Sequence, residues 1–135
     1  MTIVVGYVPT PQGEAALDRA IIEAGRDGGQ KLVVVNASKS DPLEGDRAIA
    51  DRRRIGQIES RLRSSVAEYE LRQPLRGQDP ADEIVDTAEA FGASLIVIGL
   101  RKRSSVGKMI FGSTAQGVLM NASCPVLSVK AMTER

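Results

Sequence analysis

The stretch that decides the fold is LIVIGLRKRSSVGKMIFGST, residues 95–114. Its first four residues are apolar and mostly β-branched, a pattern that predicts a strand buried on both faces, as in a parallel sheet. A segment rich in glycine, serine and basic residues follows, and a short helix is expected to begin near Ser113. Ligands of such sheets bind outside the carboxyl ends of the strands, so this segment lies where a ligand site is expected.

Four further segments have the character of strands. The apolar runs at residues 3–5, 32–35 and 126–129 predict three of them. A weaker strand is expected over residues 69–75, where polar and apolar side chains alternate and Pro74 interrupts the run, as at a sheet edge. With the strand at 95–98, the sequence predicts five strands.

Helical patterns separate these strands. Thr10 and Asp79 each precede a proline, the cap-plus-proline signal of a helix start. A charged helix with a thin apolar stripe is expected from about residue 46 to residue 65, and glycines at 28, 29 and 92 are expected to end the first and third helices.

The resulting order, β-α-β-α-β-α-β-α-β, predicts an α/β fold: a five-stranded parallel sheet with helices on both faces. The 135 residues contain no linker or internal repeat, so we expect one domain over residues 1–135. Apolar residues make up 42% of the chain and charged residues 26%, as in folded globular domains.

Composition also narrows the function. The net charge of +1 predicts no general attraction to nucleic acid or to a membrane. The single cysteine, Cys124, excludes an internal disulfide and favours a cytoplasmic protein. The chain has no histidine, which excludes Ser-His and Cys-His nucleophile pairs and the common zinc sites.

The segment after the strand at 95–98 has the parts of an anion site. Glycines at 99, 107 and 112 are expected to allow close backbone approach and positive φ. The helix start offers unpaired amides, and Ser113 and Thr114 add hydroxyl groups. Four basic residues lie within eight positions, at 101, 102, 103 and 108. Met109 follows Gly107 and Lys108, so this is not a Walker loop. Two alternatives stay open: a structural connection with solvated charges, and Ser113 as a helix N-cap only.

The segment resembles the signature of the universal stress protein family, G-x2-G-x9-G-[ST]. Here it reads Gly99-x2-Lys102-x9-Gly112-Ser113, and a cysteine-proline pair precedes the last strand, as in the family. The resemblance implies a Rossmann-like fold of the adenine nucleotide alpha hydrolase type, with strand order 3-2-1-4-5. It also implies a regulatory protein of the stress response that binds ATP, with magnesium as a possible companion.

By position, the resemblance implies a site with two sides. The phosphate and ribose side would be formed by Ile98, Gly99, Arg101, Gly112, Ser113 and Thr114, with Lys102 able to meet a phosphate. The base side would be formed by Pro9, Thr10 and Ala37.

The last strand, which begins at Val126 and ends at Val129, predicts a homodimer. An apolar edge strand left open invites association, and pairing with its own copy across a two-fold axis closes that edge. The family resemblance implies dimerisation through the same strand.

Three functions compete. The first is a nucleotide-binding regulatory protein. The second is a dimeric interaction module without nucleotide, because Val8 stands where ATP-binding members have aspartate and Lys102 stands at the second signature glycine. The third, a slow ATP hydrolase, ranks last, since the chain has no histidine, lacks the aspartate after the first strand, and has no residue clearly placed to orient a water.

Overall fold

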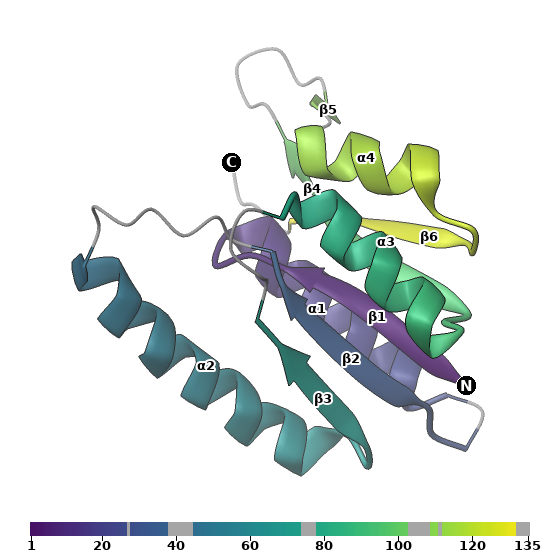
Figure 1. Cartoon of the computed structure of the whole chain (residues 1–135). Helices are drawn as coiled ribbons and strands as arrows, with labels where there is room; N and C mark the ends of the chain where they lie inside the picture. The colour runs from purple at the N-terminus through teal and green to yellow at the C-terminus, as the bar shows by residue number, and fades with distance from the viewer. Residues whose placement is uncertain (27, 38–44, 74–77, 103–108, 111, 132–135) are drawn as a thin grey trace.

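A computed structural model describes residues 1–26, 28–37, 45–73, 78–102, 109–110 and 112–131, although not the side chains of 45–51, 101–102 and 109–110. The helices and strands follow in the order β1 (Thr2–Tyr7), α1 (Pro11–Ala24), β2 (Lys31–Asn36), α2 (Gly45–Ser65), β3 (Tyr69–Arg72), α3 (Pro80–Phe91), β4 (Leu95–Lys102), β5 (Met109–Ile110), α4 (Ser113–Asn121) and β6 (Val126–Lys130) (Figure 1).

Five strands form a parallel sheet in the order β3-β2-β1-β4-β6. β6 is the fifth strand that the sequence predicts, so the expected order 3-2-1-4-5 is confirmed. Among the described strands, β3 pairs with β2 alone and β6 with β4 alone, so both lie at edges. β3 ends at Arg72, earlier than expected, and residues 74 and 75 of the predicted strand lie outside the described part of the chain.

The region after residue 98 differs from the expected loop. β4 continues to Lys102, and the short strand β5 pairs with it antiparallel, with Arg101 opposite Ile110 and Lys102 opposite Met109. The strand continues because its ladder with β6 extends to Leu100, whose side chain is only 7% exposed. Residues 103–108 between the two strands lie outside the description.

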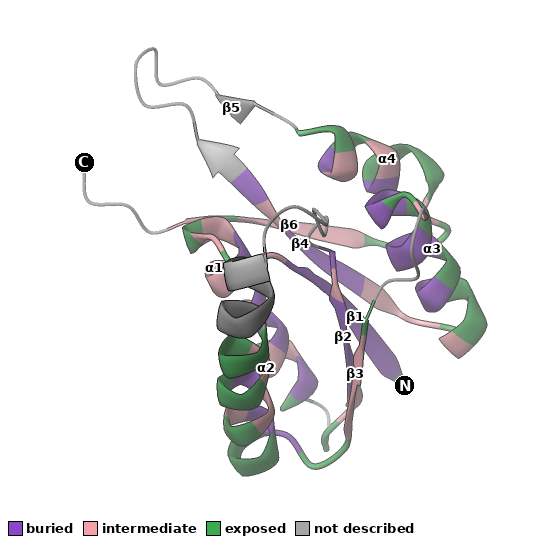
Figure 2. Ribbon diagram, turned by 60° about the vertical axis from the view of Figure 1, so that its left-hand side comes forward, coloured by how far each residue is buried: buried purple, intermediate pink, exposed green. Residues whose placement is uncertain are grey.

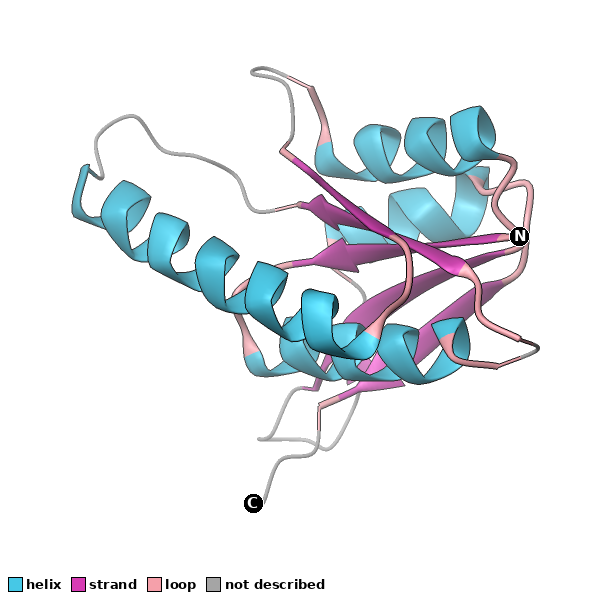
Figure 3. Ribbon diagram, turned by 90° about the horizontal axis from the view of Figure 1, so that it is seen from below, coloured by secondary structure: helices cyan, strands magenta, loops and turns pink. Residues whose placement is uncertain are grey.

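Helices cover both faces of the sheet, as Figure 3 shows. On one face, Ile3, Val5 and other strand residues pack with α1 and with Ile58 and Leu62 of α2. On the other face, Val4 and its neighbours pack with α3 and α4. The central strands are buried along their length (Figure 2), which explains why their sequences read as unbroken apolar runs.

Two helix starts follow the predicted signals. The Thr10 hydroxyl accepts a hydrogen bond from the Gly13 amide at 3.1 Å, and the Asp79 carboxylate accepts from the next two free amides of α3. α3 ends at Gly92 in the left-handed conformation, as predicted. α1 ends at Ala24 rather than at residues 28 and 29, because Ala24 is the last residue of its buried face.

Glycine is required inside α1 by a close backbone contact. A Cβ atom at Gly13 would lie 1.8 Å from the carbonyl oxygen of Val8, whereas a Cβ at Gly56, within α2, would meet no described atom within 4 Å. We expect Gly13→Ala to lower the free energy of unfolding by about 1–3 kcal/mol through overpacking. Gly56→Ala should raise it by up to about 1 kcal/mol through helix propensity. Urea unfolding followed by circular dichroism measures both, and equal effects would contradict this account.

Candidate functional site

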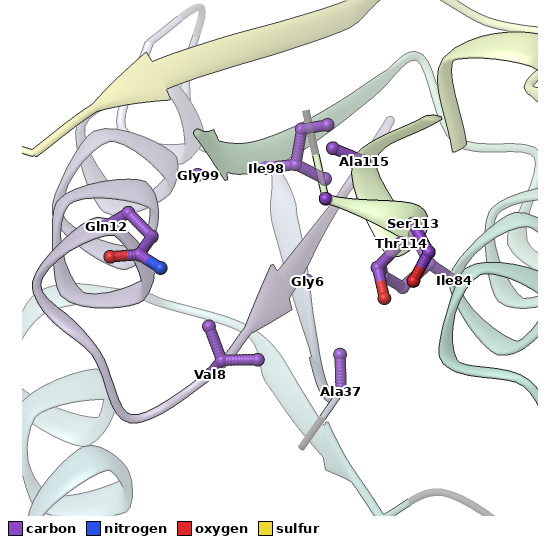
Figure 4. Close-up of a pocket in the computed structure, with 11 residues that line it drawn as sticks. Gly6, Val8, Gln12, Ala37, Ile84, Ile98, Gly99, Ser113, Thr114 and Ala115 are labelled. Atoms are coloured by element: carbon purple, nitrogen blue, oxygen red, sulfur yellow. The ribbon is translucent and has the colours of Figure 1, made fainter. Parts of the chain in front are cut away.

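A cavity of about 240 Å³ lies at the carboxyl ends of β1 and β4. These strands are neighbours in the sheet, but the chain continues from β1 to β2 on one side and from β4 toward β6 on the other. This is the switch point at which parallel sheets bind ligands. The cavity is lined by Gly6, Val8, Gln12, Ala37, Ile84, Ile98, Gly99, Gly112, Ser113, Thr114 and Ala115 (Figure 4).

Six of the ten predicted site residues line this cavity: Ala37, Ile98, Gly99, Gly112, Ser113 and Thr114. Pro9 is exposed and Thr10 caps α1, and neither lines the cavity. Arg101 and Lys102 lie in β4, and their side chains are outside the description.

The sequence interpretation did not find Gln12, Ile84, Gly6 or Ala115. Gln12 carried a usable signal, since it follows the Thr10-Pro11 helix start and that start faces the carboxyl edge of the sheet. Ile84 carried none, because it belongs to the regular apolar face of α3.

The start of α1 reaches the cavity because position 99 has no side chain. A Cβ at Gly99 would lie 2.2 Å from the backbone oxygen of Gln12, so glycine here allows close approach of α1. The positive φ expected at this glycine is wrong, because residue 99 lies within strand β4. The Gln12 carboxamide lies on one side of the cavity, and Ser113 and Thr114 of α4 lie on the other (Figure 4). The cavity therefore has the first turns of two helices in its wall.

Gly112 differs from the expectation of positive φ and close approach. Its φ is −65°, and an added Cβ would meet no described atom within 4 Å. The residue that caps α4 is Gly112, not Ser113, and it makes no side-chain cap hydrogen bond. The first amides of a helix have no partner within the helix and carry partial positive charge. At α4 these amides belong to residues that line the cavity, which suits an anion.

The wall away from the α4 start is apolar. It is formed by Val8 and Ala37, whereas Ile84 lies beside Ser113 and Thr114 (Figure 4). A Cβ at Gly6 would lie 2.5 Å from Cδ1 of Ile84. The backbone here is already paired, since Ala37 N donates to Tyr7 O at 2.7 Å and Thr10 N donates to Val8 O at 2.8 Å. This wall suits a flat apolar group better than a charged one.

The described lining contains no carboxylate. The described residues also contain no cluster of three or more His, Cys, Asp or Glu side chains that could hold a metal ion. Magnesium is commonly held through one or two carboxylates together with substrate phosphates. The described lining therefore offers no carboxylate to hold the magnesium ion expected to accompany ATP.

Comparison with known proteins agrees with these features. The model of the universal stress protein family matches residues 1–130. The chain belongs to this family. A universal stress protein from Mycolicibacterium smegmatis is 40% identical over 129 residues, which cover 95% of this chain and 96% of the relative.

Solved structures of the family resemble this one. A universal stress protein from Archaeoglobus fulgidus has a TM-score of 0.76 and 35% identity, covering 96% of this chain and 97% of its own. A second structure, from the same organism and in complex with dAMP, has a TM-score of 0.71 and 30% identity, covering 96% of each chain. In the part of the chain that is described, no helix is both long and apolar enough to cross a membrane.

The family signature runs from β4 to the start of α4 in this structure. Its first glycine, Gly99, makes the close contact with α1, and its last two positions, Gly112 and Ser113, line the cavity. Lys102, at the second signature position, is paired with Met109 in a strand, so it sits in backbone that accepts a side chain.

A polar cluster lies behind the Val8 side of the cavity. The Tyr7 hydroxyl donates to Oε2 of Glu14, and Nη1 of Arg54 donates to the same oxygen at 2.8 Å and to the Tyr7 hydroxyl at 3.4 Å. Burial of Tyr7, followed by its hydrogen bond to Glu14, raises the pKa of the phenol to about 12. The fold therefore favours the neutral phenol.

This shift predicts a loss of stability in strong alkali. The ordinary phenol pKa is about 10, so the contribution is complete below pH 10 and is lost as the pH rises toward 12. The chain has two tyrosines, so in Tyr69→Phe the phenolate absorbance near 295 nm reports Tyr7 alone. We expect its midpoint near 12. A midpoint near 10, with the far-ultraviolet circular dichroism of the folded protein retained, would refute this.

Proposed function

We propose that this chain is a regulatory protein that binds an adenine nucleotide in the cavity between β1 and β4. The observation that carries the proposal is the start of α4, where Gly112 leaves open space and Ser113 and Thr114 place hydroxyls and free helix amides at the cavity. The A. fulgidus relative in complex with dAMP supports an adenine nucleotide as the ligand.

In this proposal the two ends of the cavity take different parts of the ligand. The phosphate lies on Gly112, Ser113 and Thr114, and the base lies against the apolar wall that includes Val8 and Ala37. Gln12 lies across the cavity from Ser113 and Thr114, and its carboxamide can hydrogen-bond the sugar or a phosphate oxygen. The phosphate contacts expected of Arg101 and Lys102 stay predictions, because these side chains lie outside the described part of the structure.

The ligand should raise the melting temperature. At about 100 times its dissociation constant, a nucleotide adds about 2.7 kcal/mol to the free energy of unfolding. For a chain of this length that corresponds to roughly 10 °C. We expect this shift with AMP and with ATP, and we expect it to persist in EDTA, because no described residue of the lining offers a carboxylate to magnesium. An unchanged melting temperature at millimolar nucleotide would refute the proposal.

Substitution at Gly112 separates ligand binding from folding. Gly112→Val places a branched side chain in the open space at the α4 start, so the thermal shift should disappear while the protein without ligand still folds. Gly56→Val places the same side chain on an exposed position of α2 and should keep the shift. An unchanged shift in Gly112→Val would place the ligand elsewhere.

The alternative is a dimeric module of the same family that binds no nucleotide. It is favoured by Val8, which leaves the base wall without a carboxylate. The melting experiment decides between the two functions, since the module would show no nucleotide shift.

We further propose that the chain forms a homodimer through β6. Among the described strands β6 is paired on one side only, and its apolar residues, Val126, Leu127 and Val129, are only half-buried. Antiparallel pairing with the β6 of a second copy would close this edge. Sedimentation over a series of protein concentrations should give twice the mass of 14.4 kDa at micromolar protein. A monomer across that range would refute the dimer.

A further inference from the structure

The loop that joins β1 to α1, residues 8–10, is held closed at both ends. The Tyr7 hydroxyl, just before the loop, donates to the Glu14 carboxylate, just after it. Within this bracket, Thr10 N donates to Val8 O at 2.8 Å and Glu14 N donates to Thr10 O at 2.9 Å. The loop supplies Val8 to the cavity wall, so the Tyr7–Glu14 bond constrains the shape of that wall.

Tyr7 also touches the cavity wall through its backbone. Its neighbours in the chain, Gly6 and Val8, both line the cavity, and its carbonyl accepts the hydrogen bond from Ala37, a third lining residue. Its side chain turns to the other face of the sheet, where it packs with the cluster under α1 and α2. Tyr7 therefore connects the cavity, at the carboxyl edge of the sheet, to the face that α1 and α2 cover.

Helix α2 binds to α1 through a short row of ion pairs. Arg54 and Arg61 lie seven residues apart on α2, and Glu14 and Asp18 lie four apart on α1, so each pair occupies one helix face. Arg54 Nη1 lies 2.8 Å from Glu14 Oε2, Arg61 Nη1 lies 3.9 Å from Glu14 Oε1, and Arg61 also contacts Asp18. The Glu14 carboxylate thus pairs with both arginines and accepts the hydrogen bond from Tyr7.

Among the described side chains of α2, few others are buried. Ile58 and Leu62 are its buried apolar residues in the described part, Ile55 is half-buried, and residues 52–54 are exposed (Figure 2). The ion pairs are themselves 37–57% exposed, and such pairs are individually weak and screened by salt. Among the described contacts, Arg54 is held to the domain through Glu14 and Tyr7. Exposed contacts of this kind are the first to open in local unfolding.

We propose that Glu14 is a positioning residue that couples the docking of α2 to the shape of the nucleotide cavity. When α2 is docked, Arg54 and Tyr7 fix the Glu14 carboxylate, and the β1–α1 loop is held against the cavity. By reciprocity, a ligand that orders the loop strengthens the docking of α2. This inference rests on the proposed function, since it takes a nucleotide as the ligand.

Trypsin provides the test, because residues 52–54 are three consecutive arginines on α2. Cleavage in this segment is followed by mass spectrometry in the wild type and in Glu14→Gln, with and without saturating AMP, and AMP affinity is measured on the same proteins. The matched control is Glu23→Gln, which removes ion pairs to Arg19 of α1 and to Arg26 just after the end of α1. No described contact joins Glu23 to α2 or to Tyr7. Tyr7→Phe removes only the hydroxyl from the cluster.

In the wild type, AMP should slow cleavage of this segment severalfold. Glu14→Gln should be cleaved about tenfold faster without AMP, should gain no protection from AMP, and should bind AMP about fivefold or more weakly, within the usual range of coupling between sites. Tyr7→Phe should also lose the protection by AMP, and Glu23→Gln should behave as the wild type. If AMP binds Glu14→Gln as tightly as the wild type and slows its cleavage to the same extent, the proposed coupling is wrong, while the nucleotide site is supported. If AMP binds to none of the proteins, the nucleotide site and the coupling are both wrong. Faster cleavage of Glu14→Gln would then show only that Glu14 holds α2 to α1.

Discussion

The start of helix α1 lies against strand β4 at a separation that a side chain at position 99 would prevent. A Cβ there would sit 2.2 Å from the Gln12 backbone oxygen, and a Cβ at Gly13 would collide with the Val8 carbonyl. These two contacts set the height of α1 over the sheet. They bring Gln12 into the cavity, shape the β1–α1 loop, and place Glu14 within reach of Tyr7 and α2. The ligand site and the docking of α2 both depend on this packing.

The parts of the fold that local patterns determine were predictable. β1, β2 and β4 are buried on both faces, so their apolar runs are unambiguous, and Thr10 and Asp79 cap their helices as their sequences indicate. The continuation of β4 was not predictable in the same way. It depends on pairing with β6, some thirty residues away, and on burial of Leu100 against the other face of the domain.

In the candidate site, too, the residues of a local motif were predictable and the residues placed by the fold were not. Gly99, Gly112, Ser113 and Thr114 lie in one contiguous motif, and they line the cavity as the motif indicates. Ile84 comes from a helix whose residues give no local sign of the cavity. Tyr7 joins the cluster behind the cavity through Glu14, in the next helix, and through Arg54 of α2. Pro9 and Thr10 show the reverse case. They follow the carboxyl end of β1, but neither lines the cavity, and the Thr10 side chain instead caps α1.

Gly112 has a bearing on how substitutions at this site are tolerated. Its backbone angles suit any residue, and among the described atoms nothing crowds the space where a side chain would go. Folding alone therefore places no demand for glycine at this position, in contrast to Gly13 and Gly99. A library of variants at residue 112 selected for folded protein should return many amino acids, and the same library selected for nucleotide binding should return glycine and the smallest side chains. The difference between the two selections separates pressure for function from pressure for stability at a single position.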